Sequence, residues 1–388
     1  MIFTVTKNKK NELKKNIPLA IYVVMITLFF NLYFPVSPQD TEKEKDKTWH
    51  LLEMGKLKME KGEFGEALHY ANIAREVHKN QIEKKYKSLF NSLKPKQVKY
   101  AGDDIFDVYA VLKDREDYDA CAILDDIFLT HPPVFFDQSI SKLMTWLEKK
   151  TAFPETDFLT GQIYSAEGEY GQALHYYKLA WDYRLFLEIP DARFNIIYEL
   201  ADTSKLLHKY DDQEKYLLLV LTEDSIYGTT NLESPTLQAM IKTLTTEKTA
   251  EKFFLLYRHH NSIALKAYMD LTEIYLQAGN TGRALTAAAL AANIAVTNLD
   301  EAVSKVDFNY SYENFSNLLY KLTGKEEILN WAENQNFWKA FLNLADALAA
   351  EKYTEQAAYL YQKIAESVPS IKYAQEAVYK KRTLSEKR

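Results

Sequence analysis

The chain has 388 residues and a formal net charge of −6, so it exceeds the usual size of one compact core and has no general electrostatic reason to bind nucleic acid. Its 11 glycines and 10 prolines are too few for the turns of a many-stranded sheet, which favours helix. The single cysteine, Cys121, excludes an intramolecular disulfide framework and any metal site built from several cysteines.

The first predicted element is a membrane-spanning helix within residues 16–37, which contain no charged side chain. The apolar run Ile17–Phe34 would rise about 27 Å as a helix, close to the roughly 30 Å hydrocarbon core of a bilayer. Lysines dominate residues 1–15, whereas residues 38–47 form a charged linker in which the two signs balance. The positive-inside rule therefore predicts a cytoplasmic amino terminus in a bacterial inner membrane, with the following domain in the periplasm or otherwise outside the cytoplasm.

Two alternatives remain for this segment. A cleaved signal peptide would show the same order of charged and apolar parts. However, the apolar run is longer than a usual signal core, and the small residue after it, Ser37, is followed by Pro38. A helix buried in a protein core is the other alternative. An uncleaved membrane anchor is the favoured interpretation.

Beyond residue 48 the chain contains one phrase twice. The segments GEFGEALHYANIA (Gly62–Ala74) and GEYGQALHYYKLA (Gly168–Ala180) begin 106 residues apart and are identical at eight of thirteen positions. This offset corresponds to about three units of a 34-residue helical repeat. In the second phrase we expect Gly168 to end one helix with a left-handed backbone and Ala173 to permit a close helix crossing. Tyr177 and Ala180 would continue the buried stripe.

The pattern resembles the tetratricopeptide repeat, whose unit has small residues at positions 8, 20 and 27 and aromatic residues at 11, 17 and 24. The unit around the second phrase matches fully, with Gly161, Tyr164, Tyr170, Ala173, Tyr177 and Ala180. Partial matches are Gly55, Phe64, Ala67 and Ala74 in one unit, Tyr275, Ala284 and Ala291 in another, and Ala345, Ala357, Tyr361 and Pro369 in a fourth. The first of these departs from the pattern at Lys58 and Ala71.

The resemblance implies an all-α fold, a right-handed superhelical solenoid of helical hairpins that follows one transmembrane helix. We expect this repeat domain to cover residues 48–376 and to be followed by a basic tail, residues 377–388. About six hairpins are predicted, starting near residues 48, 102, 154, 194, 265 and 338. Residues 225–262 and 300–335 fit the repeat poorly and are expected to form longer helices or exposed loops.

The resemblance also implies a binding face. In such arrays the first helix of each unit lines a concave groove that holds a peptide or helix of a protein partner. The residues that the alignment of units assigns to this groove are Trp49, Leu52, Lys56, Met59, Phe158, Gln162, Ser165, Lys266, Met269, Glu273, Leu276, Lys339, Leu342 and Asp346.

Candidate catalytic and metal-binding residues have simpler interpretations. His69 and His175 occupy the same repeat position, so we expect several layers of the array to separate them. His259 and His260 are adjacent, and neighbouring residues of a helix project about 100° apart. Cys121 takes an alanine position of the repeat and is predicted to be core. No phosphate-binding, zinc-protease or nucleophile motif occurs. We therefore predict no catalytic residue, no metal and no cofactor.

The predicted function is that of a membrane-anchored, extracytoplasmic scaffold for protein–protein interactions that serves in assembling an envelope machine, such as a secretion system, a pilus or a periplasmic flagellar structure. A holdase-like periplasmic chaperone associated with a translocon is the alternative. An enzyme with its site in residues 225–262 or 301–324 is a third hypothesis, which no motif supports. The oligomeric state is left open.

Overall fold

The computed structural model describes residues 38–93, 102–224, 232, 234–246, 250–368 and 370–386, with side chains from Lys47 onward. Within these ranges the chain is all-α, as predicted, because it contains helices and no strand. The predicted membrane span, residues 16–37, lies outside the described residues. Of the helices in the described part, none combines the length and the apolar character needed to cross a bilayer.

The α-helices are α2 (Pro38–Glu60), α3 (Phe64–Ser92), α4 (Ile105–Asp114), α5 (Tyr118–Thr130), α6 (Ile140–Lys149), α7 (Pro154–Ala166), α8 (Tyr170–Asp182), α9 (Ala192–Leu206), α10 (Tyr210–Leu221), α11 (Pro235–Thr246), α12 (Ala250–Leu256), α13 (Ala264–Gln277), α14 (Thr281–Val306), α15 (Phe315–Leu322), α16 (Glu326–Asn334), α17 (Phe337–Ala350), α18 (Thr354–Ser367) and α19 (Ile371–Glu386). Two short 3-10 helices are η1 (Pro133–Phe136) and η2 (Arg184–Phe186).

Two predicted boundaries differ from these helices. Residues 38–47, expected to be a linker, form the first turns of α2. Asp40, Glu42 and Glu44 each precede a lysine by three residues, a spacing that stabilises helix. At the other end, α19 continues through the expected boundary between residues 376 and 377, so the described part of the basic tail is helical.

Six helix pairs lie where hairpins are predicted, namely α2/α3, α4/α5, α7/α8, α9/α10, α13/α14 and α17/α18. All six have the same three-residue turn, whose middle residue has φ between 56° and 83°. These middle residues are Gly62, Glu116, Gly168, His208, Gly279 and Lys352. The residue after each one donates its N–H to the carbonyl five positions earlier, as from Glu169 to Tyr164 at 2.8 Å. This is the Schellman arrangement, which satisfies carbonyls at a helix end.

Helices α15 and α16 have a turn of the same length, centred on Gly324 with φ +80°, in a region that was expected to lie outside the repeats. Its hydrogen bond spans three residues and not five, because the N–H of Lys325 donates to the carbonyl of Leu322 at 3.0 Å.

The predicted buried stripe of α8 is confirmed, since Ala173, Tyr177 and Ala180 are fully buried. The crossing of α7 and α8 is close because Gly161 faces the ring of Tyr177. A side chain at Gly161 would collide with this ring.

The two copies of the repeated phrase lie in neighbouring helix pairs, contrary to the prediction that several layers separate them. Helix α3 packs directly on α7, where Arg75 and Asp157 form an ion pair of 2.8 Å, and Gly55 of α2 lies against Leu159 of α7. His69 and His175 are thus in adjacent pairs, and both side chains are exposed. The chain between the copies leaves the stack and returns to it.

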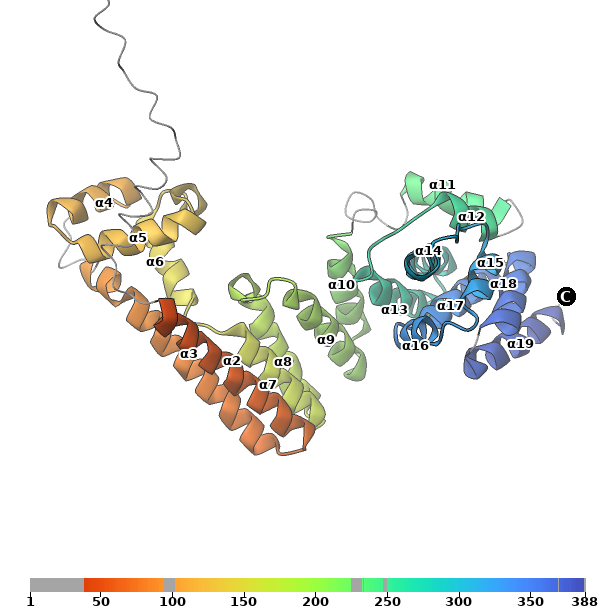
Figure 1. Ribbon diagram of the computed structural model, residues 1–388, viewed down its shortest axis with the longest axis horizontal. Coiled ribbons are helices and arrows are strands. Elements are labelled where there is room, and N and C mark those ends of the chain that lie inside the picture. The colour runs from red at the N-terminus through yellow and green to blue at the C-terminus, as the bar shows by residue number, and fades with distance from the viewer. Residues whose placement is uncertain are drawn as a thin grey trace, which may run out of the picture.

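That intervening chain forms a lobe of α4, α5, η1 and α6 on the carboxyl-terminal half of α3 (Figure 1). Lys85 of α3 pairs with Asp126 of α5 at 3.0 Å, and Ser92 donates to Asp117. The lobe has its own core, which includes Leu112, Leu124 and Leu143. The second predicted hairpin is therefore a side branch and not a layer of the stack.

In the carboxyl-terminal half, α14 is a central helix that contacts α11, α13, α15, α16 and α17, and Figure 1 shows it end-on among them. Its middle part is buried on every side, from Ala284 to Thr297. The segment is rich in alanine, whose small side chain lets neighbouring helices approach from several directions.

Candidate functional site

The predicted groove residues lie on α2, α7, α13 and α17, the first helices of their pairs. For three of them the prediction is wrong: Leu52, Met269 and Leu342 are only 2%, 5% and 3% exposed. These side chains belong to the hydrophobic core, so they cannot contact a partner in this conformation. The other eleven are partly exposed.

At the amino-terminal end, the partly exposed groove residues already have intramolecular contacts. Trp49 donates its indole N–H to Glu188 at 2.7 Å, and Met59 packs against the α2, α3 and α7 core. Lys56 pairs with Glu53 of the same helix at 2.7 Å, and Phe158 lies 5.7 Å from the ring of Tyr177. These four side chains thus contribute to the intramolecular packing of this end.

Farther along, charged side chains link one first helix to the next. Lys266 of α13 lies between two carboxylates, with its Nζ 2.8 Å from Asp202 of α9 and 2.7 Å from Asp270 of α13. The contact between α9 and α13 is reinforced by Tyr198, whose hydroxyl accepts a hydrogen bond from the backbone N–H of Ala267 at 3.2 Å. These bonds fix the register of α13 on α9.

The same pattern continues from α13 to α17. Glu273 of α13 accepts Lys339 of α17 at 2.5 Å and lies 3.9 Å from Lys205 of α9. One carboxylate therefore connects three helices.

The last step joins α17 to α19. Lys380 of α19 contacts Asp346 of α17 at 2.6 Å and Glu376 of its own helix at 2.8 Å. Asp346 also accepts the hydroxyl of Tyr361 at 2.6 Å. We call this series the charged ladder, and its members are Asp202, Lys205, Lys266, Asp270, Glu273, Lys339, Asp346 and Lys380.

The pKa shifts within the ladder follow from the sharing of partners. Burial lowers the pKa of Lys266, but Asp270 and Asp202 outweigh it, and the pKa lies above its ordinary value. For Asp270 burial is the larger effect, and the pKa of its carboxyl is raised despite Lys266. Two carboxylates stabilise the charged form of Lys266, whereas Asp202 and Asp270 share this one lysine. Burial and then Asp202 also raise the pKa of Glu199 nearby.

Sequence reasoning found only part of the ladder. Lys266, Glu273, Lys339 and Asp346 are in the predicted set, whereas Asp202, Lys205, Asp270 and Lys380 are not. Asp202 and Lys205 lie on α9, whose unit matches the repeat weakly, and Lys380 lies in the expected tail. For Asp202, Lys205 and Asp270 the available signal was their charge on the first helix of a predicted pair.

His259, His260 and Cys121 lie in different surroundings. His259 is buried and its Nε2 lies 3.0 Å from Asp224, whereas His260 is exposed and pairs with Glu301 at 2.7 Å. Cys121 is 6% exposed and belongs to the core of the lobe, as predicted. Among the described residues, no group of three or more histidine, cysteine, aspartate or glutamate side chains could hold a metal ion.

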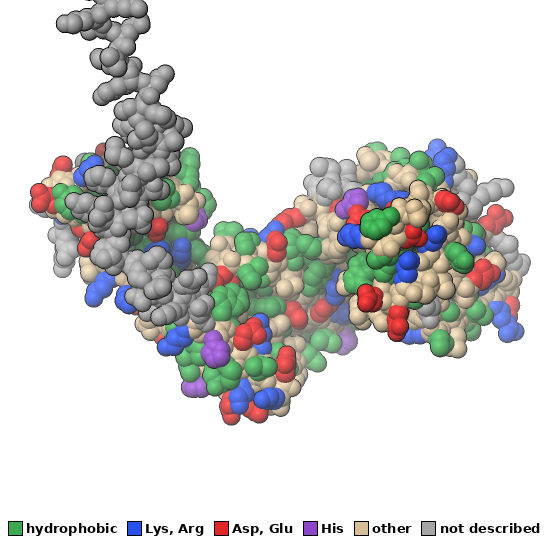
Figure 2. All heavy atoms as spheres, in the orientation of Figure 1, with side chains coloured by type: hydrophobic (Ala, Val, Ile, Leu, Met, Phe, Trp, Pro, Cys, Tyr) green, Lys and Arg blue, Asp and Glu red, His purple; other side chains and the backbone are tan. Residues whose placement is uncertain are grey.

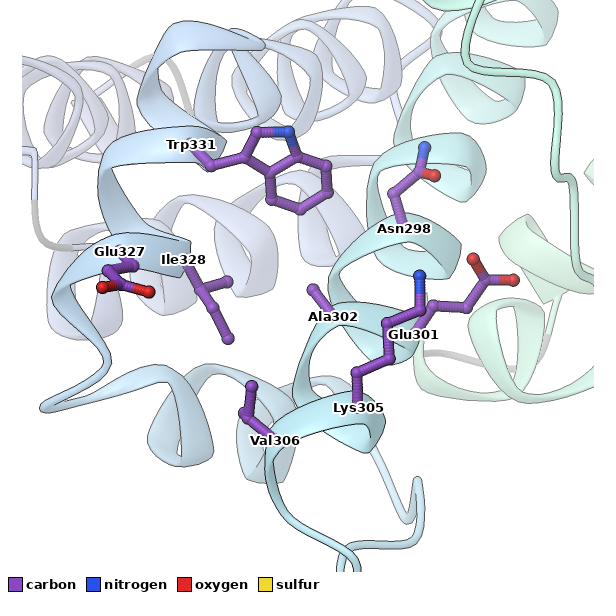
Figure 3. A pocket seen from close by; sticks show the side chains of 8 residues that line it. All are labelled: Asn298, Glu301, Ala302, Lys305, Val306, Glu327, Ile328 and Trp331. Atoms are coloured by element: carbon purple, nitrogen blue, oxygen red, sulfur yellow. The ribbon is translucent and has the colours of Figure 1, made fainter.

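A surface pocket of about 340 Å³ lies between α14 and α16 (Figure 3). Ala302, Val306, Ile328 and Trp331 form its apolar part, and Glu301, Lys305, Glu327 and Asn298 complete the lining. Figure 3 shows the lining side chains converging from the two helices across an open space. The charged groups of this pocket are distinct from those of the ladder.

Comparison with known proteins identifies a protein of Treponema pallidum (strain Nichols) that is 42% identical over 344 residues. The match covers 89% of this chain and 92% of the Treponema protein, which is described as uncharacterized. No protein-family model matches the chain.

Proposed function

We propose that this chain, which belongs to the same protein family as the Treponema pallidum protein, is a scaffold that binds a protein partner along the charged ladder. The observation that carries the proposal is the continuity of the ladder over α9, α13, α17 and α19. A surface of this length suits an extended segment better than a small substrate.

The electrostatics support recognition. The ladder side chains are partly exposed, so a partner can reach them, and their mutual contacts hold them in place before binding. Ion pairs of this kind contribute little to stability, yet alternating charge discriminates strongly between partners.

The six Schellman turns support a tetratricopeptide-like array, because they repeat one hairpin geometry at the six predicted places. We extend the proposal to a right-handed solenoid that is anchored in a bacterial inner membrane by residues 16–37, with the repeats in the periplasm. Anchoring would concentrate the scaffold near partners in the envelope, where it would help to assemble a secretion, pilus or periplasmic flagellar machine.

In-cell crosslinking followed by mass spectrometry of the full-length protein tests the partner-binding part. We expect one dominant protein partner, and we expect its yield to fall strongly in a Lys205→Glu, Lys339→Glu variant. Lys178→Glu, a reversal of an exposed lysine on α8, is the matched control and should leave the yield unchanged.

Equal capture by the ladder variant would reject the ladder as the binding face. A diffuse set of unrelated unfolded chains would instead support the holdase alternative.

The anchor is tested separately, since deletion of residues 16–37 should release the protein from membranes at alkaline pH. Release of the full-length chain under the same conditions would reject the anchor.

A further inference from the structure

One end of the α4–α6 lobe carries large apolar side chains that the fold leaves exposed. Leu129, Val134 and Phe135 are 79%, 69% and 56% exposed, and Phe106 is 56% exposed. Leu129 lies in the last turn of α5, and η1 follows it directly. Phe106 belongs to the same end because the N–H of its neighbour Ile105 donates to the carbonyl of Gln138 at 2.9 Å. We call these four residues the apolar end of the lobe.

The apolar end rests on a packed aromatic base. The ring of Phe135 lies edge-on to Phe136 at 5.0 Å and to His131 at 5.1 Å. Phe136 is buried and packs against Trp146 at 5.5 Å. A ring held in this way loses little conformational entropy when a partner covers it.

The lobe also concentrates the negative charge of the chain. Residues 102–150 contain eleven aspartates and glutamates against five lysines and arginines, a net charge of −6 that equals the charge of the whole chain. Near the apolar end are Asp103, Asp104 and Asp107, whereas Asp137 and Lys142 pair with each other. Figure 2 shows acidic side chains at the edge of the lobe.

From this combination we propose that the apolar end is a docking site for a basic amphipathic segment of a partner protein. Leucine-like side chains of the segment would cover Leu129, Val134 and Phe135, and its lysines or arginines would face the surrounding aspartates. The acidic lobe repels nucleic-acid phosphates and anionic lipid surfaces, so a protein segment is the occupant that matches both the apolar and the charged parts. This site is separate from the charged ladder and does not depend on it.

Fluorescence anisotropy tests the site with the full-length protein in nanodiscs. The probe is a labelled synthetic peptide of leucine and lysine with helical amphipathic periodicity. We expect saturable binding that weakens as salt screens the charges. A peptide of the same composition in scrambled order, and one with glutamate in place of lysine, should bind much more weakly.

Variants locate the binding. Val134→Ser with Phe135→Ser should weaken binding about tenfold or more, because two apolar contacts are lost. Asp107→Asn should weaken it and reduce its salt dependence. The matched control is Ile371→Ser with Tyr379→Ser, which changes two residues of α19 that are 73% and 70% exposed. Circular dichroism checks that each variant is folded.

Unchanged affinity in the Val134, Phe135 variant would overturn the proposal. An equal loss in the α19 control, or equal binding of the scrambled peptide, would also overturn it, since binding would then be non-specific. None of these results depends on partner capture by the ladder, which the crosslinking experiment measures.

Discussion

Gly161 of α7 lies directly against the ring of Tyr177 of α8, so that a Cβ atom at residue 161 would be 2.5 Å from two ring carbons. Tyr177 is fully buried, and its hydroxyl lies 3.4 Å from Glu199 of the next helix pair. The ring is therefore held from two sides. The contact between Gly161 and Tyr177 determines how α7 and α8 cross. The hydroxyl of Tyr177 then joins this helix pair to α9.

Replacing Gly161 by alanine should consequently destabilise the fold, because the new methyl group overpacks the crossing. We expect a loss of about 1–3 kcal/mol in the free energy of unfolding, measured by urea denaturation. The matched control is Gly171→Ala on α8, where a Cβ would meet nothing within 4 Å. The control should be neutral or stabilising, since alanine favours helix over glycine. Equal stability of the two variants would contradict the packing described for Gly161.

The shared turn geometry predicts opposite effects at equivalent positions. Lys352 has φ +66° and is exposed, so Lys352→Gly should raise the free energy of unfolding by up to about 1 kcal/mol through relief of backbone strain. Gly168 has φ +83° at the same place in its turn, and Gly168→Ala should lower it by about 1 kcal/mol. Thermal unfolding of both variants checks this pair, and a change of the same sign in both would refute it.

The ladder should matter more for binding than for folding. Lys339→Ala removes a partly exposed ion pair with Glu273 and should cost less than about 1 kcal/mol of stability. The same variant should reduce partner crosslinking, because Glu273 loses its nearest cation. Denaturation and crosslinking of one preparation separate the two effects, and a large loss of stability would mean that the ladder is structural.

A pH dependence is expected where the lobe meets the stack. Burial is the main effect that lowers the pKa of His78, whose ring stacks on Phe153 at 4.5 Å. Burial followed by Lys150 lowers the pKa of His131. Because the unfolded chain binds protons more readily at both sites, their contribution is fully present above the ordinary histidine pKa of about 6.5. It is lost as the pH falls from there through the lowered values.

Urea denaturation at pH 7.5 and pH 5.5 measures this dependence. The decrease in stability at the lower pH should be smaller in His78→Phe than in the unaltered protein. His69→Phe replaces an exposed histidine and serves as the control. The prediction fails if the two variants respond equally to pH.

Local sequence patterns were sufficient to predict where the six helix pairs lie. Gly62, Gly168 and Gly279 mark three of the six turns, because glycine adopts a left-handed backbone at low cost. Glu116, His208 and Lys352 adopt the same conformation without this signal, and their turns were predicted from the small and aromatic repeat positions around them. At these three positions the packing of the helices imposes a left-handed backbone that the residue type disfavours.

Contacts between distant parts of the chain could not be predicted in the same way. Leu52, Met269 and Leu342 follow the repeat register of groove residues, yet neighbouring helices bury them. The lobe leaves the stack because α3 extends past α2 and offers Tyr86 and Leu89 as a surface for α5. A repeat period predicts the spacing of hairpins along the sequence. It does not predict which hairpins pack against each other.

Helix α3 has a further consequence, because it is one uninterrupted helix of 29 residues, about 43 Å long at 1.5 Å per residue. Its first part packs on α2 and α7 in the stack, and its carboxyl-terminal part carries the lobe. The lobe is thus held on the stack by a continuous helix, and Trp146 of α6 also lies 6.0 Å from Phe186, which follows α8. A partner that binds both the apolar end and the stack must match this fixed arrangement, and two different partners would be held at a fixed separation.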